Sequence, residues 1–322
     1  MPSALAIGID LGGTNIKGGL CDAAGRLVAQ RAVPTEGERG PDHVIGRMAS
    51  MARDLLAAAG GQSVRVLGVG APGPISHARG VIFRAPNLPQ WINIPLRDRL
   101  SDALPGLVVV LENDANAAAY GEFVAGAGAD VEDMAMLTLG TGVGGGVVVA
   151  GRLVRGAFDN AGEIGHMIIE PAGRPCPCGQ RGCLERYASA NAIAERTAEA
   201  IAGGARSTLA ARVSSGERIT SADVLAAARA GDTLAAQVWD SACRYLALAV
   251  VNIQHLYNPQ LVVFSGGLIQ AGAEHLLVPI QRHFDLLRWK IAPDAPRLAL
   301  ATLGTDAGVI GAAALARETL PG

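Results

Sequence analysis

Aromatic side chains are scarce in this sequence, where five Phe, four Tyr and three Trp make up 4% of the 322 residues. Half of the residues are hydrophobic, and 42 are Gly. This composition is typical of a compact α/β protein with a core of small aliphatic side chains, and it excludes a disordered or fibrous chain. A chain of this length is expected to form two lobes, each large enough to bury its own core.

Charge of one sign and long apolar runs are also missing. The net charge is −2 and there is no basic block, so nucleic acid is not expected as a partner. No apolar run reaches the roughly 20 residues that a membrane-spanning helix needs. The opening MPSALAIGID has no basic segment ahead of its hydrophobic residues, so no signal peptide is expected. These absences predict a cytoplasmic protein that does not bind membranes.

Cysteine is scarce too, but three of the five cysteines fall in one short segment between Glu163 and Glu185. The four candidate metal ligands in this segment follow the pattern H-x9-C-x-C-x4-C and are His166, Cys176, Cys178 and Cys183. One imidazole and three thiolates form a closed tetrahedral zinc site, which holds a loop and leaves no position for water. A disulfide cluster is the alternative, and the odd number of cysteines and the lack of a signal peptide argue against it.

Hydrophobic periodicity gives the expected order of strands and helices. Runs rich in β-branched residues and Leu predict strands at residues 5–10, 16–20, 27–32, 64–69, 107–111, 134–139, 147–150 and 261–264. Apolar residues at helical spacing predict helices at residues 43–59, 232–256 and 306–317. The arrangement of strand, glycine turn and strand occurs twice, at residues 5–20 and 134–150, and this repeat predicts a lobe boundary between residues 116 and 129.

The two glycine turns are candidate phosphate-binding loops. The second turn, GTGVGG from Gly140, matches the G-x-G-x-x-G pattern of dinucleotide sites, but it runs into a strand and not into a helix. No Walker A motif is present. Backbone N–H groups of such turns can hold an anion, and Asp10 could hold Mg²⁺ through water. The alternative is that each turn is only a tight hairpin. A third glycine pair, Gly266 and Gly267, follows the strand predicted at residues 261–264 and could receive a nucleoside. The expected nucleotide-binding residues are Asp10, Gly12, Gly13, Thr14, Asn15, Lys17, Gly140, Thr141, Gly142, Gly144, Gly266 and Gly267.

The candidate catalytic residue is Asp114. The apolar strand predicted at residues 107–111 delivers Asn113 and Asp114 to its carboxyl end, where α/β sheets place ligands. An Asp at this position could instead cap the helix that follows. Beside two phosphate loops, however, its carboxylate suits a general base for a hydroxyl nucleophile in phosphoryl transfer.

The chain resembles the ROK family of sugar kinases, and within it the bacterial glucokinases. The resemblance covers essentially the whole sequence and is carried by residues 10–14, 71–73, 86–91, 113–114, 139–146, 163–166, 176–185 and 265–267. It implies an α/β fold of two actin-like (ribonuclease H-like) lobes with the nucleotide in the interlobe cleft. The expected domains are residues 1–118 and 119–304, with a terminal helix at 305–322 that packs back on the first lobe.

The resemblance also implies roles for individual residues. Asp114 is expected to take the proton of the sugar 6-hydroxyl, while ATP with Mg²⁺ donates the phosphoryl group. His166 is expected to bind zinc with one ring nitrogen and to face the sugar with the other. A homodimer is expected from the family alone. The expected sugar-binding residues are Gly73, Asn87, Asn113, Asp114, Glu163, His166 and Glu185.

The expected activity is ATP-dependent phosphorylation of a hexose at the 6-hydroxyl, with glucose as the substrate. N-acetylglucosamine or N-acetylmannosamine kinase is the alternative within this class, and fructokinase or mannokinase is less favoured. A sugar-sensing transcriptional repressor is the alternative from another class. Such repressors carry a DNA-binding segment ahead of the first glycine loop, which begins here at Asp10, so the repressor is disfavoured.

Overall fold

The computed structural model describes residues 5–291 and 293–320, and the chain divides into two compact units. The first unit comprises Met1–Glu132, Gly146–Gly162 and Thr302–Gly322, and the second comprises Asp133–Gly145 and Glu163–Ala301. The boundary expected at residue 118 falls inside helix α3 (Asp114–Ala125). The whole of α3 stays in the first unit because it packs against helix α10 (Ala307–Arg317).

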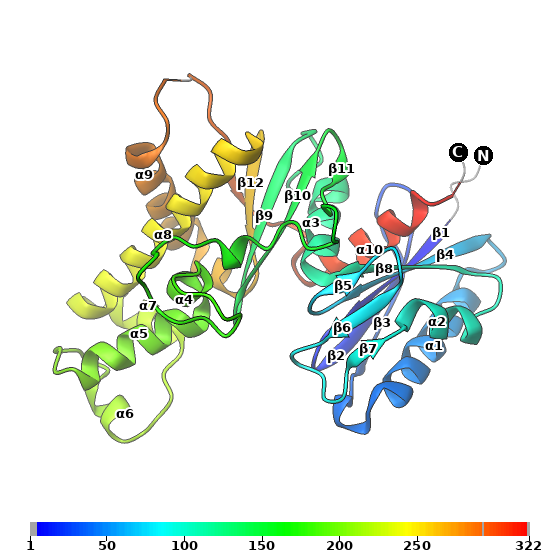
Figure 1. Cartoon of the computed structure of the whole chain (residues 1–322), viewed down its shortest axis with the longest axis horizontal. Coiled ribbons are helices and arrows are strands. Elements are labelled where there is room, and N and C mark those ends of the chain that lie inside the picture. Colours follow the sequence, from blue (N-terminus) through cyan, green and yellow to red (C-terminus); the bar gives the residue numbers. More distant parts are fainter. Residues whose placement is uncertain (1–4, 292, 321–322) are drawn as a thin grey trace. The chain divides into compact units, whose positions relative to one another are not determined.

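The first unit is built on a five-stranded sheet of order β3-β2-β1-β4-β8 (Figure 1). The pairs β1/β2 and β2/β3 are antiparallel, whereas β1/β4 and β4/β8 are parallel. All five strands confirm runs predicted from the sequence. Their bounds are β1 (Leu5–Leu11), β2 (Asn15–Cys21), β3 (Leu27–Pro34), β4 (Val64–Ala71) and β8 (Val108–Asn113).

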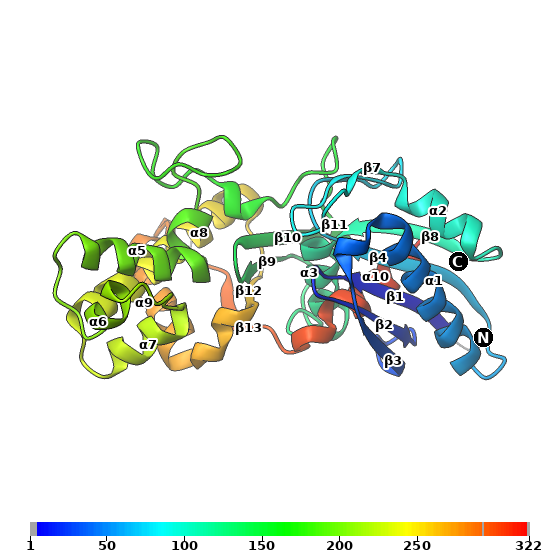
Figure 2. The same ribbon diagram turned by 90° about the horizontal axis from the view of Figure 1, so that it is seen from below.

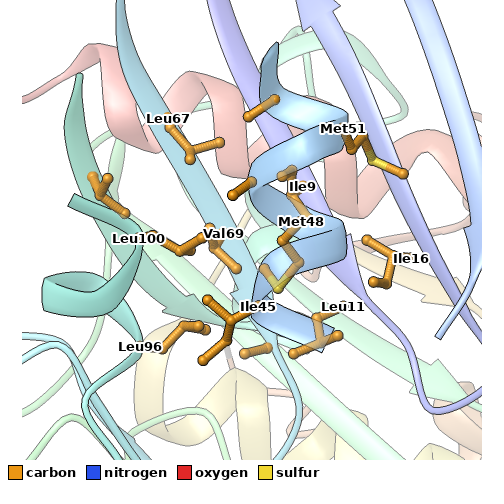
Figure 3. Close-up of a cluster of buried hydrophobic side chains, with 14 of the residues drawn as sticks. Ile9, Leu11, Ile16, Ile45, Met48, Met51, Leu67, Val69, Leu96 and Leu100 are labelled. Atoms are coloured by element: carbon orange, nitrogen blue, oxygen red, sulfur yellow. The ribbon is translucent and has the colours of Figure 1, made fainter. Parts of the chain in front are cut away.

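Alternate residues of β1 face different layers of the first unit. Ile7, Ile9 and Leu11 belong to a buried cluster with residues of α1 (Pro41–Ala58) and α2 (Leu96–Ala103) (Figure 3). Ala6 belongs instead to a second cluster that contains Val309 of α10. Helices α1 and α2 therefore cover one face of this sheet, while α10 covers the other.

The face of the sheet under α10 is lined with glycine. A Cβ added at Gly8 of β1 would lie 1.9 Å from the backbone oxygen of Val309, and one at Gly68 of β4 would lie 1.8 Å from that of Ala312. Any side chain at these positions would push the helix away from the sheet. The glycines in these strands therefore let backbone pack on backbone, and α10 is buried on all sides over residues 307–316.

A small antiparallel sheet of order β5-β6-β7 follows β4 in the first unit. Its short strands are β5 (Ile75–Ser76), β6 (Val81–Arg84) and β7 (Ile92–Ile94).

A second five-stranded sheet has the order β11-β10-β9-β12-β13. Its strands are β9 (Met134–Leu139), β10 (Val143–Val149), β11 (Arg152–Leu153), β12 (Leu261–Ser265) and β13 (Arg297–Leu300). The strand predicted at residues 147–150 starts earlier than expected, because glycines 144–146 are themselves part of β10. Gly146 packs under α3, where a Cβ would lie 2.6 Å from the Cβ of Ala119.

Helices make up most of the second unit, and Figure 2 shows α5, α7 and α8 packed side by side. The long helix predicted at residues 232–256 is confirmed as α8, with the Asp232 side chain capping its first turn. Among the described residues, no helix combines the length and apolarity that crossing a bilayer requires. The helices of this unit are α4 (Glu185–Ala188), α5 (Ala190–Ala202), α6 (Ala210–Ser214), α7 (Ser221–Arg229), α8 (Thr233–Tyr257) and α9 (Val278–Leu287).

Candidate functional site

The first glycine loop joins β1 to β2 and is tied at its base. The backbone N–H of Gly12 donates to the oxygen of Asn15 at 3.0 Å. Thr35, which is fully buried, donates from Oγ1 to the oxygen of Gly12 at 2.7 Å and from its backbone N–H to the oxygen of Thr14 at 2.8 Å. Gly13, Thr14 and Asn15 stay exposed above this anchor. No sequence pattern indicated a role for Thr35, because it lies 23 positions from Gly12 along the chain.

Asp10 lies just behind this loop, opposite Lys17 in the pairing of β1 with β2. Burial raises the pKa of the Asp10 carboxyl, and the Lys17 ammonium only partly lowers it. The start of α10 approaches the same carboxyl, since a Cβ added at Gly308 would lie 3.0 Å from Cγ of Asp10. The position of Asp10 behind the glycine loop keeps it a candidate for holding Mg²⁺ through water, and this role stays a prediction.

Asn113 and Asp114 occupy the carboxyl end of β8 and the first position of α3. The Asn113 side chain caps α3, accepting from the backbone N–H of Ala115 at 2.9 Å and of Asn116 at 3.1 Å. Its Nδ2 donates to the oxygen of Gly73 at 3.3 Å. The cap is therefore Asn113 and not Asp114, whose Oδ1 accepts from the N–H of Ala115 at 2.8 Å.

Glu112, the residue before this pair, is a buried acid that the sequence analysis missed. Its Oε1 accepts from the backbone N–H of Asn113 at 3.0 Å and from Nδ2 of Asn116 at 3.1 Å. Arg155 donates from Nε to its Oε2 at 2.7 Å. A Glu at the end of an apolar strand run is the signal that could have revealed it, because buried acids are rare unless they are paired.

Asn87 lies in the loop between β6 and β7 and is exposed. The loop surrounds a cavity of about 320 Å³ that residues 84–92 line. A Cβ added at Gly13 of the first glycine loop would lie 3.1 Å from Cβ of Asn87. The first unit thus brings a residue expected to bind nucleotide against one expected to bind sugar.

The second glycine loop, residues 140–142, joins β9 to β10 in the second unit. Gly140 donates from its N–H to the oxygen of Gly142 at 3.0 Å and accepts from the N–H of Ala190 at 2.9 Å. Thr141 is exposed at the tip, whereas Gly144 lies within β10. The loop is therefore shorter than the glycine run in the sequence suggests.

Gly266 and Gly267 lie at the end of β12, where a short 3-10 helix follows. Gly266 has a φ of 87°, and a Cβ there would lie 2.5 Å from the backbone oxygen of Leu139. This position beside the last residue of β9 places Gly266 at the start of the second glycine loop.

His166, Cys176, Cys178 and Cys183 form one cluster whose candidate ligand atoms all lie within 4.8 Å of one another. Sγ of Cys178 is 3.7 Å from Sγ of Cys183, and Nδ1 of His166 is 3.8 Å from Sγ of Cys176. Zinc–sulfur bonds of about 2.3 Å in a tetrahedron separate the sulfurs by about 3.8 Å. The donor set and its spacing therefore fit a zinc ion.

The thiols of this cluster differ in acidity. Burial and the neighbouring thiols raise the pKa of Cys183 to about 12. Cys178 is exposed, and although what burial it has raises its pKa, the backbone N–H of Gln180 and the other thiols lower it overall. A bound cation favours the thiolate form of all three cysteines, since thiolates are the ligating species.

The acids at the two ends of this segment lie near the cluster in different ways. Glu163 is exposed, and its backbone oxygen accepts from the N–H of His166 at 3.0 Å. Glu185 begins α4, with Oε1 lying 3.8 Å from Sγ of Cys176. Its Oε2 accepts from the backbone N–H of Val143 at 3.2 Å. Glu185 therefore joins the metal cluster to the second glycine loop.

The predicted site residues fall into two groups, one in each unit. The first unit holds Asp10, Gly12, Gly13, Thr14, Asn15, Lys17, Gly73, Asn87, Asn113 and Asp114. The second unit holds Gly140, Thr141, Gly142, Gly144, Glu163, His166, Cys176, Cys178, Cys183, Glu185, Gly266 and Gly267.

Comparison with known proteins covers nearly the whole chain. The family model described as "ROK family" matches residues 6–319. A glucokinase of Halalkalibacterium halodurans is 38% identical over 97% of this chain and 94% of its own length. An N-acetylmannosamine kinase of Citrobacter koseri is 32% identical over 97% of this chain and 98% of its own length.

Two solved structures resemble the fold closely. The ROK hexokinase from Thermus thermophilus has a TM-score of 0.83 and 34% identity, with 98% of each chain covered. A ROK family glucokinase from Streptomyces griseus, in complex with glucose and AMPPNP, has a TM-score of 0.76 and 35% identity, covering 98% of this chain and all of that one. These likenesses confirm the expected α/β fold with two actin-like lobes. Because the family model matches residues 6–319, nearly the whole sequence, the chain belongs to the ROK family.

Proposed function

We propose that this protein is an ATP-dependent hexose kinase that phosphorylates glucose at its 6-hydroxyl. The observation that carries the proposal is the position of Asp114, the first residue of α3 at the carboxyl end of β8. The Asn113 side chain caps the first turn of α3 and thereby fixes the position of the Asp114 backbone. The likeness to glucokinases over the full chain favours glucose as the substrate.

In the proposed reaction the oxygen of the sugar 6-hydroxyl bonds to the γ-phosphorus of ATP. As this bond forms, the Asp114 carboxylate accepts the proton of the hydroxyl. The bond between this phosphorus and the bridging oxygen breaks, and ADP leaves. Positioning matters more than base strength, because the transition state of phosphoryl transfer is loose. Mg²⁺, when bound, neutralises charge on the phosphates. The residues proposed to bind the other sugar hydroxyls are Gly73, Asn87, Asn113, Glu163, His166 and Glu185.

We propose that the nucleotide binds the two glycine loops. Exposed N–H groups and hydroxyls at their tips, as at Thr14 and Thr141, suit phosphate oxygens. Asp10 would hold Mg²⁺ through water, and Lys17 beside it would offset its charge. Gly266 and Gly267 would take the nucleoside, because they lie next to the second loop.

The proposed role of zinc is to hold the segment from Glu163 to Glu185. The ion would bind Nδ1 of His166, which leaves Nε2 for a sugar hydroxyl. A ring fixed in this way is a better hydrogen-bond partner than a free one. We also propose a cytoplasmic homodimer that supplies glucose 6-phosphate to glycolysis.

A coupled assay of ADP release tests the activity. Purified protein with Mg-ATP is expected to turn over glucose with a higher kcat/KM than mannose, fructose, N-acetylglucosamine or N-acetylmannosamine. The likeness to an N-acetylmannosamine kinase makes the last sugar the second candidate substrate. A higher kcat/KM for N-acetylmannosamine than for glucose would select that alternative, and turnover of none of the five would refute the kinase proposal.

A further inference from the structure

The Glu185 carboxylate lies between the second glycine loop and the metal cluster of the second unit. Its Oε2 accepts from the backbone N–H of Val143 at 3.2 Å, directly after the second glycine loop. A Cβ added at Gly142 would lie only 2.2 Å from the same oxygen. Its Oε1 lies 3.8 Å from Sγ of Cys176. The carboxylate of a proposed sugar-binding residue therefore lies against a loop proposed to bind phosphate.

This position disfavours the binding of an anion to the loop. One backbone N–H, that of Val143, is already occupied by the carboxylate. A phosphate at the loop would also meet the like charge of Glu185 at close range, which costs free energy even in water-like surroundings. Sugar hydroxyls, in contrast, donate hydrogen bonds to a carboxylate and attract it.

We infer that Glu185 couples the two substrate sites, a conclusion that rests on the proposed function. In the arrangement that the structure shows, the Glu185 carboxylate is bound to Val143 and obstructs the glycine loop. When sugar binds, its hydroxyls draw the carboxylate away, so the N–H of Val143 becomes free for a phosphate oxygen. Sugar therefore tightens nucleotide binding, and by linkage nucleotide tightens sugar binding by the same factor.

Calorimetric titration with Mg-AMPPNP tests this coupling. Each variant is titrated without sugar and with saturating glucose, or with the hexose that the wild type binds best. In the wild type the sugar is expected to tighten nucleotide binding by about fivefold or more, within the usual range of such couplings. Glu185→Gln keeps the shape but removes the charge. The affinity of this variant for nucleotide without sugar should rise by about fivefold. Saturating sugar should then increase its nucleotide affinity by no more than about twofold.

Glu163→Gln is the matched control, because it removes the same charge from another proposed sugar-binding glutamate, which is exposed. It should weaken sugar binding, yet leave the sugar-free nucleotide affinity within about twofold of the wild type. At saturating sugar the tightening should be retained.

A second pair of variants acts from the side of the loop. Gly142→Ala displaces the Glu185 carboxylate, whereas Gly140→Ala places its methyl group where no atom lies within 4 Å. Neither glycine has a positive φ, so both backbones accept Ala. The factor by which sugar increases nucleotide affinity should fall at least about threefold in Gly142→Ala and should persist in Gly140→Ala. This expectation concerns the ratio of the two affinities, so it holds even if either substitution changes nucleotide affinity itself.

The outcomes separate the coupling from the activity. Phosphorylation of glucose by the wild type, with equal tightening in the wild type, Glu185→Gln and Gly142→Ala, overturns the coupling alone. Absence of any tightening in a wild type that turns over glucose does the same. A wild type that binds no hexose refutes the proposed function, and the coupling with it.

Discussion

Arg155 donates a hydrogen bond from Nε to Oε2 of Glu112 at 2.7 Å, and this pair lies directly behind Asn113. The Glu112 side chain is 3% exposed and that of Arg155 is 25% exposed. Nδ1 of His77 also lies 3.7 Å from Oε2 of Glu112. The acid thus ties the end of β8, where Asp114 follows, to the segment after β11.

Replacement of Arg155 and replacement of Glu112 should lower the free energy of unfolding by different amounts. Arg155→Met leaves a buried charge with a weaker set of partners, and the free energy of unfolding should fall by about 3 kcal/mol. Glu112→Gln leaves a cation that reaches solvent, and should cost about 1 kcal/mol. Urea unfolding followed by circular dichroism measures both. The double variant should be more stable than Arg155→Met alone, and a purely additive loss would contradict the buried-charge explanation.

Replacement of Asp114 tests its role as base. Asp114→Asn keeps the size of the side chain but cannot accept the hydroxyl proton. We expect kcat to fall by roughly two to four orders of magnitude, with sugar affinity nearly unchanged. The assay is ADP release, with glucose affinity measured by titration. Near-normal turnover would remove Asp114 as the base.

The strands of the first unit could be predicted because their apolar runs are uninterrupted on the α1 side. Ile7, Ile9 and Leu11 show this clearly. The sheet face under α10 is harder to predict. The glycines there allow close packing of the helix on the strands, but in the sequence they resemble a turn signal. For the same reason the glycines after Val143 resemble part of a loop in the sequence, although they belong to β10.

Local sequence predicted the metal cluster better than the contacts that support the glycine loops, and it suggested Asp114 as a possible cap of α3 where the structure has Asn113. The ligand spacing around Cys176 identified a candidate site that the structure brings together. The anchor that Thr35 gives to the first glycine loop joins residues more than twenty positions apart. The bond between Glu185 and Val143 spans 42 positions. Side-chain contacts of this range depend on the folded topology, which periodicity does not encode.

Asp10→Asn should raise the Tm of the ligand-free protein at pH 7 while lowering activity. Burial raises the pKa of Asp10, so its ionised form is disfavoured in the folded state. Stability contributed by such a group is complete below its unfolded pKa and is lost as pH rises through its folded pKa. The gain in Tm should therefore shrink as the pH falls toward 4. A gain that grows on acidification would contradict a raised pKa.

Cysteine reactivity should distinguish Cys178 from the isolated cysteines. In chelator-treated protein, iodoacetamide at neutral pH should modify Cys178 first, because it is exposed and its pKa is lowered. Burial raises the pKa of Cys21 and of Cys243 to about 12, so both should stay unmodified in the folded protein. Peptide mass spectrometry gives the order of modification. One bound zinc per chain should protect Cys178, and equal rates with and without zinc would refute the ligand assignment.

The backbone contact between α10 and α3 should not tolerate a side chain at Gly311. A Cβ added at Gly311 would lie 1.7 Å from the backbone oxygen of Ala117, and backbone cannot rotate aside as a side chain can. Gly311→Ala should therefore lower the free energy of unfolding by at least about 2 kcal/mol.

Gly46→Ala is the matched control for that substitution. Gly46 is exposed within α1, and no atom lies within 4 Å of an added Cβ. The helix should gain about 0.5–1 kcal/mol, since Ala loses less backbone entropy than Gly. Opposite signs for the two Gly-to-Ala changes in urea unfolding would locate the constraint in the α10–α3 contact. Equal effects would mean that α10 shifts freely, and that its packing against α3 does not depend on the absence of a side chain at Gly311.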